Sequence, residues 1–126
     1  MISWNTLCYN LTALAELPNG GGAEIEFCLN GKQYFIVHYR QAVTLTYSPD
    51  GFDVNGNSVE YRYSSMEELG AARDFGFTLK DEWNNVTDYV CRPSFDDFTL
   101  DEILEGYKKA WNGRNKIGRA SCRERV

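Results

Sequence analysis

The first run of apolar residues has the spacing of one face of an α-helix. Its members are Trp4, Leu7, Cys8, Leu11, Leu14 and Ala15. Ser3 stands directly before them and suits the N-cap position, because its hydroxyl accepts a backbone N–H of the first turn. Pro18 and the glycines at 20–22 do not continue a helix. The pattern therefore predicts an amphipathic helix over residues 4–17.

A period of two replaces the helical spacing from residue 23 on. Residues 24–29 alternate polar with apolar side chains, Asn30-Gly31 follows, and the alternation resumes over residues 33–39. An Asn-Gly pair between two such runs predicts a hairpin with a type I′ turn, which needs positive φ at both central residues. This register places Phe27 opposite Tyr34 and Ile25 opposite Ile36.

Two further stretches continue the predicted sheet. Residues 42–48 alternate Val43, Leu45 and Tyr47 with threonines and end at a Ser-Pro-Asp-Gly turn sequence. A second hairpin is predicted from residues 52–54, a turn at 55–57 and a strand over residues 59–63. The sheet is thus expected to be a four-stranded antiparallel meander.

Helical signals return after residue 64. Ser65 and Glu68 have capping-box spacing, which predicts a helix to about residue 73. Thr78 is a weaker cap for a second helix, expected to continue toward Tyr89. The third helix has a capping box at Thr99 and Glu102, and its apolar stripe comprises Leu100, Ile103, Leu104, Tyr107 and Trp111. We therefore expect an α+β fold in a single domain, with an N-terminal helix, the four-stranded meander and three C-terminal helices packed on one face.

The last ten residues, IGRASCRERV at 117–126, have no apolar periodicity. They resemble, residue for residue, a translated sequencing adapter, which points to a gene read at the broken end of an environmental or metagenomic contig. We expect them to be non-native and assign the domain to residues 1–116.

Composition and charge narrow the classes of function. With 43% hydrophobic and 14% aromatic residues, the chain is expected to fold. The formal net charge is −5, and removing the three arginines and one glutamate of residues 117–126 leaves residues 1–116 at −7. Direct binding of nucleic acid or of an anionic membrane is therefore not expected, because phosphate neutralisation needs clustered cations.

Cysteine usage and the N-terminus favour a cytoplasmic location. Cys8, Cys28 and Cys91 are scattered and odd in number, and Cys122 lies in the suspect tail. Such a set makes neither a disulfide framework nor a zinc site. The first ten residues have no basic flank and no long apolar run, so no signal peptide or membrane span is expected.

No residue constellation predicts an enzyme, a cofactor or a metal site. His38 is the only histidine, and no carboxylate partner for it is identifiable from the sequence. None of the cysteines stands in an activating context. Residues 50–57 offer oxygens as a calcium loop does, but Tyr61 occupies the position where that loop needs a carboxylate. We expect a non-enzymatic protein.

An acidic run is the strongest candidate for a binding site. Five carboxylates fall within ten residues: Asp96, Asp97, Asp101, Glu102 and Glu105. Acids at a helix N-terminus are favoured by roughly 0.3–1 kcal/mol each, but five exceed what one helix end uses. We expect these residues, with Phe98 as aromatic anchor, to bind a basic surface of another protein; Phe95, Tyr107 and Trp111 are alternative anchors.

The stretch from residue 24 to residue 90 resembles a loose group of short uncharacterised bacterial α+β proteins. The shared features are Glu-Ile-Glu-Phe at 24–27, Asn30-Gly31-Lys32, Glu67-Glu68-Leu69, Thr78-Leu79 and Trp83. They are turns, caps and core positions, so the resemblance implies a fold and no activity.

Together these observations favour a phage or mobile-element inhibitor of a host nuclease, similar to an anti-CRISPR, that imitates nucleic acid in a basic groove. An immunity protein against a nuclease toxin is a close alternative. A second alternative is a small-ligand binder, such as a nucleotide-signal sponge, using tyrosines with Arg40 or Arg62.

Overall fold

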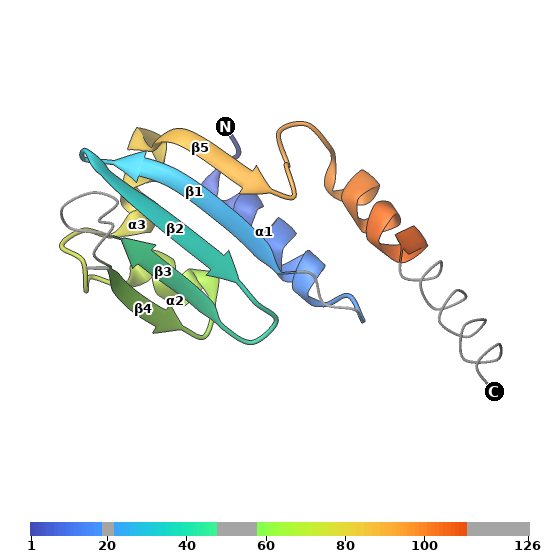
Figure 1. Ribbon diagram of the computed structural model, residues 1–126, viewed down its shortest axis with the longest axis horizontal. Coiled ribbons are helices and arrows are strands. Elements are labelled where there is room, and N and C mark those ends of the chain that lie inside the picture. Colours follow the sequence, from blue (N-terminus) through green and yellow to red (C-terminus); the bar gives the residue numbers. More distant parts are fainter. Residues whose placement is uncertain (19–21, 48–57, 111–126) are drawn as a thin grey trace.

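A five-stranded antiparallel sheet with helices on one face forms the body of the protein (Figure 1). The structure is a computed structural model that describes residues 1–18, 22–47 and 58–110. The elements in chain order are α1 (Trp4–Ala15), β1 (Ala23–Leu29), β2 (Lys32–His38), β3 (Val43–Tyr47), β4 (Val59–Tyr63), α2 (Met66–Ala71), α3 (Leu79–Glu82), a 3-10 turn (Trp83–Asn85) and β5 (Thr87–Arg92). A last helix occupies residues 100–110.

Helix α1 forms as its apolar spacing predicts. The backbone N–H of Thr6 donates to Ser3 Oγ at 3.2 Å, which confirms the N-cap. Leu7 and Leu11 are fully buried in the main core. At the other end, the Arg40 guanidinium donates to the carbonyl oxygens of Ala15 at 3.0 Å and Leu17 at 2.7 Å. These are carbonyls that a helix end leaves without intrahelical donors, so Arg40 has a structural role here.

The hairpin of β1 and β2 confirms the register read from the sequence. Asn30 and Gly31 have φ values of 53° and 75°, as a type I′ turn requires. Phe27 lies opposite Tyr34 and Ile25 opposite Ile36. β3 and the strand over residues 59–63 add to β2 in meander order, whereas residues 52–57 of the second predicted hairpin lie outside the described residues.

The prediction of four strands is wrong, because a fifth strand lies at the other edge of the sheet. The segment expected to extend a helix toward Tyr89 instead forms β5, which pairs antiparallel with β1. Tyr89 and Cys91 turn toward the core, while Val90 and Arg92 point to the other face. In a helical conformation these residues could not form backbone hydrogen bonds with β1. Their conformation therefore depends on a tertiary contact and not on local sequence alone.

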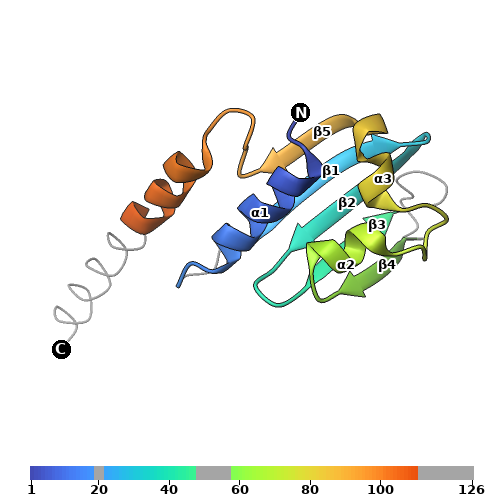
Figure 2. The same ribbon diagram turned by 180° about the vertical axis from the view of Figure 1, so that it is seen from behind.

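The two faces of the sheet differ in their cover. Figure 2 shows α1, α2 and α3 over one face, and the main core lies between them and the sheet. A row of aromatic rings crosses this covered face from Phe27 through Tyr34 and Tyr47 to Tyr61, with neighbouring centroids 5.3, 5.3 and 6.3 Å apart. Among the described residues, no helix covers the opposite face (Figure 1).

The third C-terminal helix does not pack on the sheet, contrary to the prediction. Helix 100–110 contacts the end of α1 through a separate small cluster of Leu14, Leu17 and Ile103, flanked by Phe95, Leu104 and Tyr107. In both views it projects beside the sheet (Figures 1 and 2). α2 and α3 already lie on the covered face, so the apolar stripe of the last helix is buried against α1 instead.

Candidate functional site

Residues 94–105, which we call the acidic segment, follow β5 and contain the carboxylates singled out in the sequence. A turn begins them: the Ser94 hydroxyl donates to the Asp97 carboxylate at 2.7 Å, and the Phe98 N–H donates to the Ser94 carbonyl at 3.2 Å. The predicted capping box then starts helix 100–110. Thr99 N–H donates to Glu102 Oε1 at 3.1 Å, and Glu102 N–H donates to Thr99 Oγ1 at 3.2 Å.

Only two of the five carboxylates thus accept local hydrogen bonds. Asp97 closes the turn and Glu102 closes the capping box. The side chains of Asp96, Asp101 and Glu105 are exposed and have neither a hydrogen bond nor an ion pair with another described residue. These three carboxylates therefore face solvent, and only Asp101, in the first turn of helix 100–110, can stabilise the helix through its dipole.

The two ion pairs among the described residues lie on the sheet and do not involve the acidic segment. Arg92 pairs with Glu24 and Glu26 of β1, each at 3.3 Å, on the uncovered face of the sheet. Lys108 and Lys109, in the last helix, form no ion pair within 4 Å with the described acids. Within the described residues, no lysine or arginine forms an ion pair with the acidic segment.

The candidate anchors that the structure describes differ in how far their rings are exposed. Phe98 is 54% exposed, more than any other phenylalanine among the described residues. Phe95 and Tyr107 are half-buried against the small cluster of Leu14, Leu17 and Ile103. Trp111 lies outside the described residues. Phe98 directly follows Asp96 and Asp97 in the chain, so its exposed ring belongs to the same short segment as these carboxylates.

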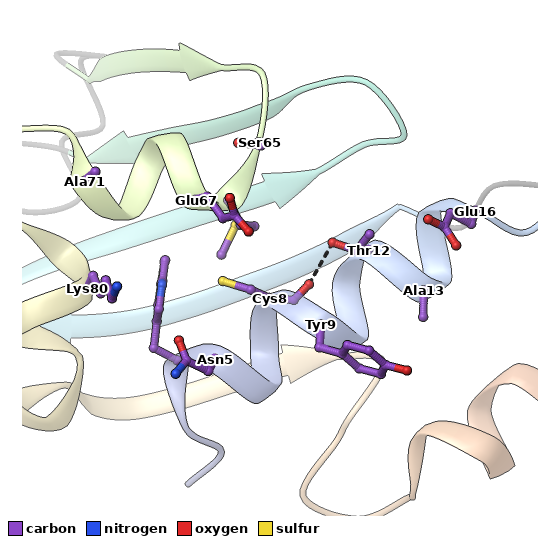
Figure 3. A pocket seen from close by; sticks show the side chains of 12 residues that line it. Asn5, Cys8, Tyr9, Thr12, Ala13, Glu16, Ser65, Glu67, Ala71 and Lys80 are labelled. Carbon is purple, nitrogen blue, oxygen red and sulfur yellow. Dashed lines mark hydrogen bonds between the residues drawn. The ribbon is translucent and has the colours of Figure 1, made fainter.

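A second surface was not anticipated from the sequence: a groove of about 830 Å³ between α1 and α2 (Figure 3). Tyr9 and Thr12 line it from α1, Glu16 from the C-cap of α1, Glu67 from α2, and Lys80 from α3. Tyr9 is 71% exposed. The signal for this exposure was present, since Tyr9 falls outside the helical stripe that contains Leu7 and Leu11.

The cysteines have the properties of packed thiols rather than nucleophiles. Burial, with a smaller contribution from the Glu67 carboxylate, raises the pKa of Cys8 to about 11. Burial likewise raises the pKa of Cys28 and of Cys91. Because the thiolate is the reactive form, these thiols are poorly suited to nucleophilic chemistry at neutral pH.

His38 is buried on the same face as Ile36, as the hairpin register predicts. It is 7% exposed, its Nδ1 has no hydrogen-bond partner, and burial lowers its pKa. His38 lines a cleft of about 390 Å³ together with Glu16, Arg40 and Ser64. No described carboxylate is hydrogen-bonded to the imidazole, so the orientation that a general base needs is not built here.

The residues of the small-ligand alternative are not brought together. Tyr34, Tyr47 and Tyr61 pack with Phe75 and Phe77 on the covered face of the sheet. Arg62 pairs in register with Thr44, on the opposite face, and Arg40 binds carbonyls of α1 and its C-terminal end. The tyrosines therefore contribute to packing rather than to a cavity lined with arginine.

No protein-family model, curated protein or solved structure matches this chain. Within residues 1–18, 22–47 and 58–110, no group of His, Cys, Asp and Glu side chains is arranged to hold a metal ion. None of the helices in these ranges combines the length and the apolar character needed to cross a membrane.

Proposed function

We propose that this protein is a non-enzymatic binding protein whose acidic segment docks on a basic surface of another protein. The observation that carries the proposal is the position of Phe98, exposed among carboxylates that have no neutralising partner in the described chain. An exposed aromatic ring supplies the desolvated anchor of an interface, and the surrounding charges supply steering and complementarity.

The charge pattern favours a nucleic-acid-binding protein as the partner. Proteins that hold nucleic acid present clustered lysines and arginines, and carboxylates held at a helix N-terminus offer them oxygens in place of phosphates. A host nuclease inhibited by a phage or mobile-element protein, as in anti-CRISPR systems, is the form of the proposal that we favour. An immunity protein against a nuclease toxin would use the same chemistry.

A cytoplasmic location belongs to the same proposal. Cys8, Cys28 and Cys91 are all free in the structure, and Cys91 is buried. Free, scattered thiols are usual in a reducing compartment. Host nucleases that act on invading DNA work in that compartment as well.

The test removes the three carboxylates that form no hydrogen bond or ion pair with another described residue. We expect the variant Asp96→Asn/Asp101→Asn/Glu105→Gln to lose at least about tenfold in affinity for the partner, because each charge facing a basic surface steers and stabilises the complex. Wild-type binding is expected to weaken between about 50 mM and about 500 mM salt, since screening shortens the range of these charges. Pull-down at both salt concentrations identifies the partner, and titration of the purified partner measures the affinity.

A matched variant removes the same charge elsewhere. Glu16→Gln/Glu67→Gln/Asp81→Asn neutralises three exposed or groove-lining carboxylates away from the acidic segment, and its affinity is expected to stay near that of the wild type. Phe98→Ala is expected to weaken binding without loss of stability, because the ring is exposed. Equal affinities of the two triple variants would refute the acidic segment as the docking surface.

A further inference from the structure

Strand β4 is the edge strand on one side of the sheet that the described residues form. The strand order is β4-β3-β2-β1-β5, so β4 pairs only with β3 among the described strands. Its pairing with β3 is regular from Val59 to Tyr63. One row of its backbone N–H and C=O groups therefore faces outward, where another strand finds ready partners.

The opposite edge, β5, is less suited to such pairing. Its register against β1 shifts between Glu26 and Cys28, and Asp88 has a positive φ of 54°. Irregularities of this kind twist an edge away from further strands. In addition, Arg92 is already paired with two glutamates of β1.

The charges of β4 complement a second copy of the same strand. Glu60 and Arg62 lie on the uncovered face, are exposed, and form no ion pair with another described residue. If two β4 strands pair antiparallel about a two-fold axis at Tyr61, Glu60 of each copy lies opposite Arg62 of the other. Both ion pairs then form across the new ladder.

Other registers are disfavoured by the same residues. Centring the axis on Glu60 or on Arg62 places like charges directly opposite one another, which is destabilising. A shift by one residue turns the covered face of one copy toward the uncovered face of the other. Only the register centred on Tyr61 places Glu60 of each copy opposite Arg62 of the other.

The covered face supports this register as well. The aromatic row that starts at Phe27 reaches the edge at Tyr61, whose ring stacks on Tyr47 at a centroid distance of 6.3 Å and an interplanar angle of 13°. Tyr61 is half-exposed at this edge. In the pairing centred on it, the Tyr61 rings of the two copies are cross-strand neighbours and continue the row from one sheet into the next.

We propose that two copies of this protein associate through β4 into a continuous ten-stranded sheet. The interface is isologous and therefore closes as a dimer. It is short, so we expect a reversible, concentration-dependent equilibrium rather than a permanent dimer. Because helix 100–110 lies beside the sheet near β1 and β5, the dimer would present its two acidic segments at opposite ends (Figure 1).

The test uses single charge reversals of the full chain and their mixture. Glu60→Arg and Arg62→Glu each place like charges across the interface, so each variant alone is expected to raise the dimer dissociation constant at least about tenfold. An equimolar mixture restores two opposite-charge pairs and is expected to form heterodimers. Sedimentation velocity from about 1 µM to about 1 mM, with one variant labelled, distinguishes these species.

Two sets of control variants test whether the effect on dimerisation is specific to β4. The double variant Glu60→Arg/Arg62→Glu restores self-complementarity and is expected to dimerise as the wild type does. Glu67→Arg and Lys80→Glu make the same charge changes on the groove between α1 and α2 and are expected to leave dimerisation unchanged. A wild-type chain that stays monomeric throughout the range, or a dimer in which the Glu60 and Arg62 variants and their mixture behave alike, overturns the proposal.

Discussion

At the scale of single residues, Gly70 shows how closely α2 packs on α1. A Cβ added at this position would lie 2.6 Å from Trp4 Cζ2 and 3.0 Å from Trp4 Cε2. The Trp4 ring cannot retreat easily, because it is buried and packs edge-on against Trp83 at 5.4 Å. The absence of a side chain at residue 70 is therefore a packing requirement and not a matter of backbone freedom.

We predict that Gly70→Ala lowers the free energy of unfolding by about 1–3 kcal/mol, as overpacking does in other cores. The matched control is Gly106→Ala in helix 100–110, where an added Cβ meets nothing within 4 Å. There the higher helix propensity of alanine is expected to stabilise the helix by about 0.5–1 kcal/mol. Chemical denaturation measures both changes in the free energy of unfolding. If both variants changed it in the same direction, the contact with Trp4 would not explain the effect at residue 70.

Burial of His38 is expected to make the stability of the protein depend on pH. Burial lowers its pKa below the ordinary value of 6.5 in the folded state, so the unfolded chain takes up a proton first as pH falls. Stability is therefore at its full value above about pH 6.5 and declines below it, by at most about 1.4 kcal/mol per pH unit for one proton.

Denaturation of the wild type and of His38→Phe between about pH 7.5 and about pH 5.5 measures this decline. The chain has no other histidine, so the slope is expected to disappear in the variant. A slope that persists in His38→Phe would assign the proton uptake to other groups.

At the scale of elements, the sequence was sufficient wherever the deciding contact is local. Asn30-Gly31 set a hairpin and its register within a few residues, and the Thr99–Glu102 capping box set a helix start within one turn. β5 was missed because its conformation depends on β1, more than fifty residues earlier in the chain. Its alternation, Tyr89 and Cys91 inward with Val90 and Arg92 outward, is too short to outweigh the helical spacing of Leu79, Trp83 and Val86.

The same distinction applies to the candidate site. The sequence located the carboxylates and the capping box, since both are features of one short segment. Phe98 was the expected anchor and Phe95 an alternative to it. The two rings differ in exposure because tertiary contacts half-bury Phe95, and such contacts cannot be read from one short segment.

At the scale of the whole molecule, two separate clusters hold the chain together. The main core joins the sheet with α1, α2 and α3, whereas helix 100–110 is attached through Leu14, Leu17 and Ile103. A small satellite cluster opens at lower free energy than the main core. The acidic segment is therefore positioned by the part of the molecule expected to be least stable.

We predict that Ile103→Ala detaches helix 100–110 without unfolding the sheet. Ile103 is 8% exposed, and truncating a buried isoleucine typically costs about 2–5 kcal/mol, which is large for so small a cluster. Amide hydrogen exchange is expected to accelerate over residues 100–110 and to stay slow in β1 and β2. Affinity for a basic partner is expected to fall although every carboxylate remains, because the turn at Ser94 and the capping box no longer hold the charges in one place.

Leu45→Ala provides the contrast, since Leu45 is fully buried in the main core. Its loss is expected to raise exchange in the sheet and in helix 100–110 together, because the small cluster does not persist without α1 in place. If Ile103→Ala produced this global pattern instead, the last helix would be an integral part of the core. The acidic segment would then be fixed as firmly as the sheet itself.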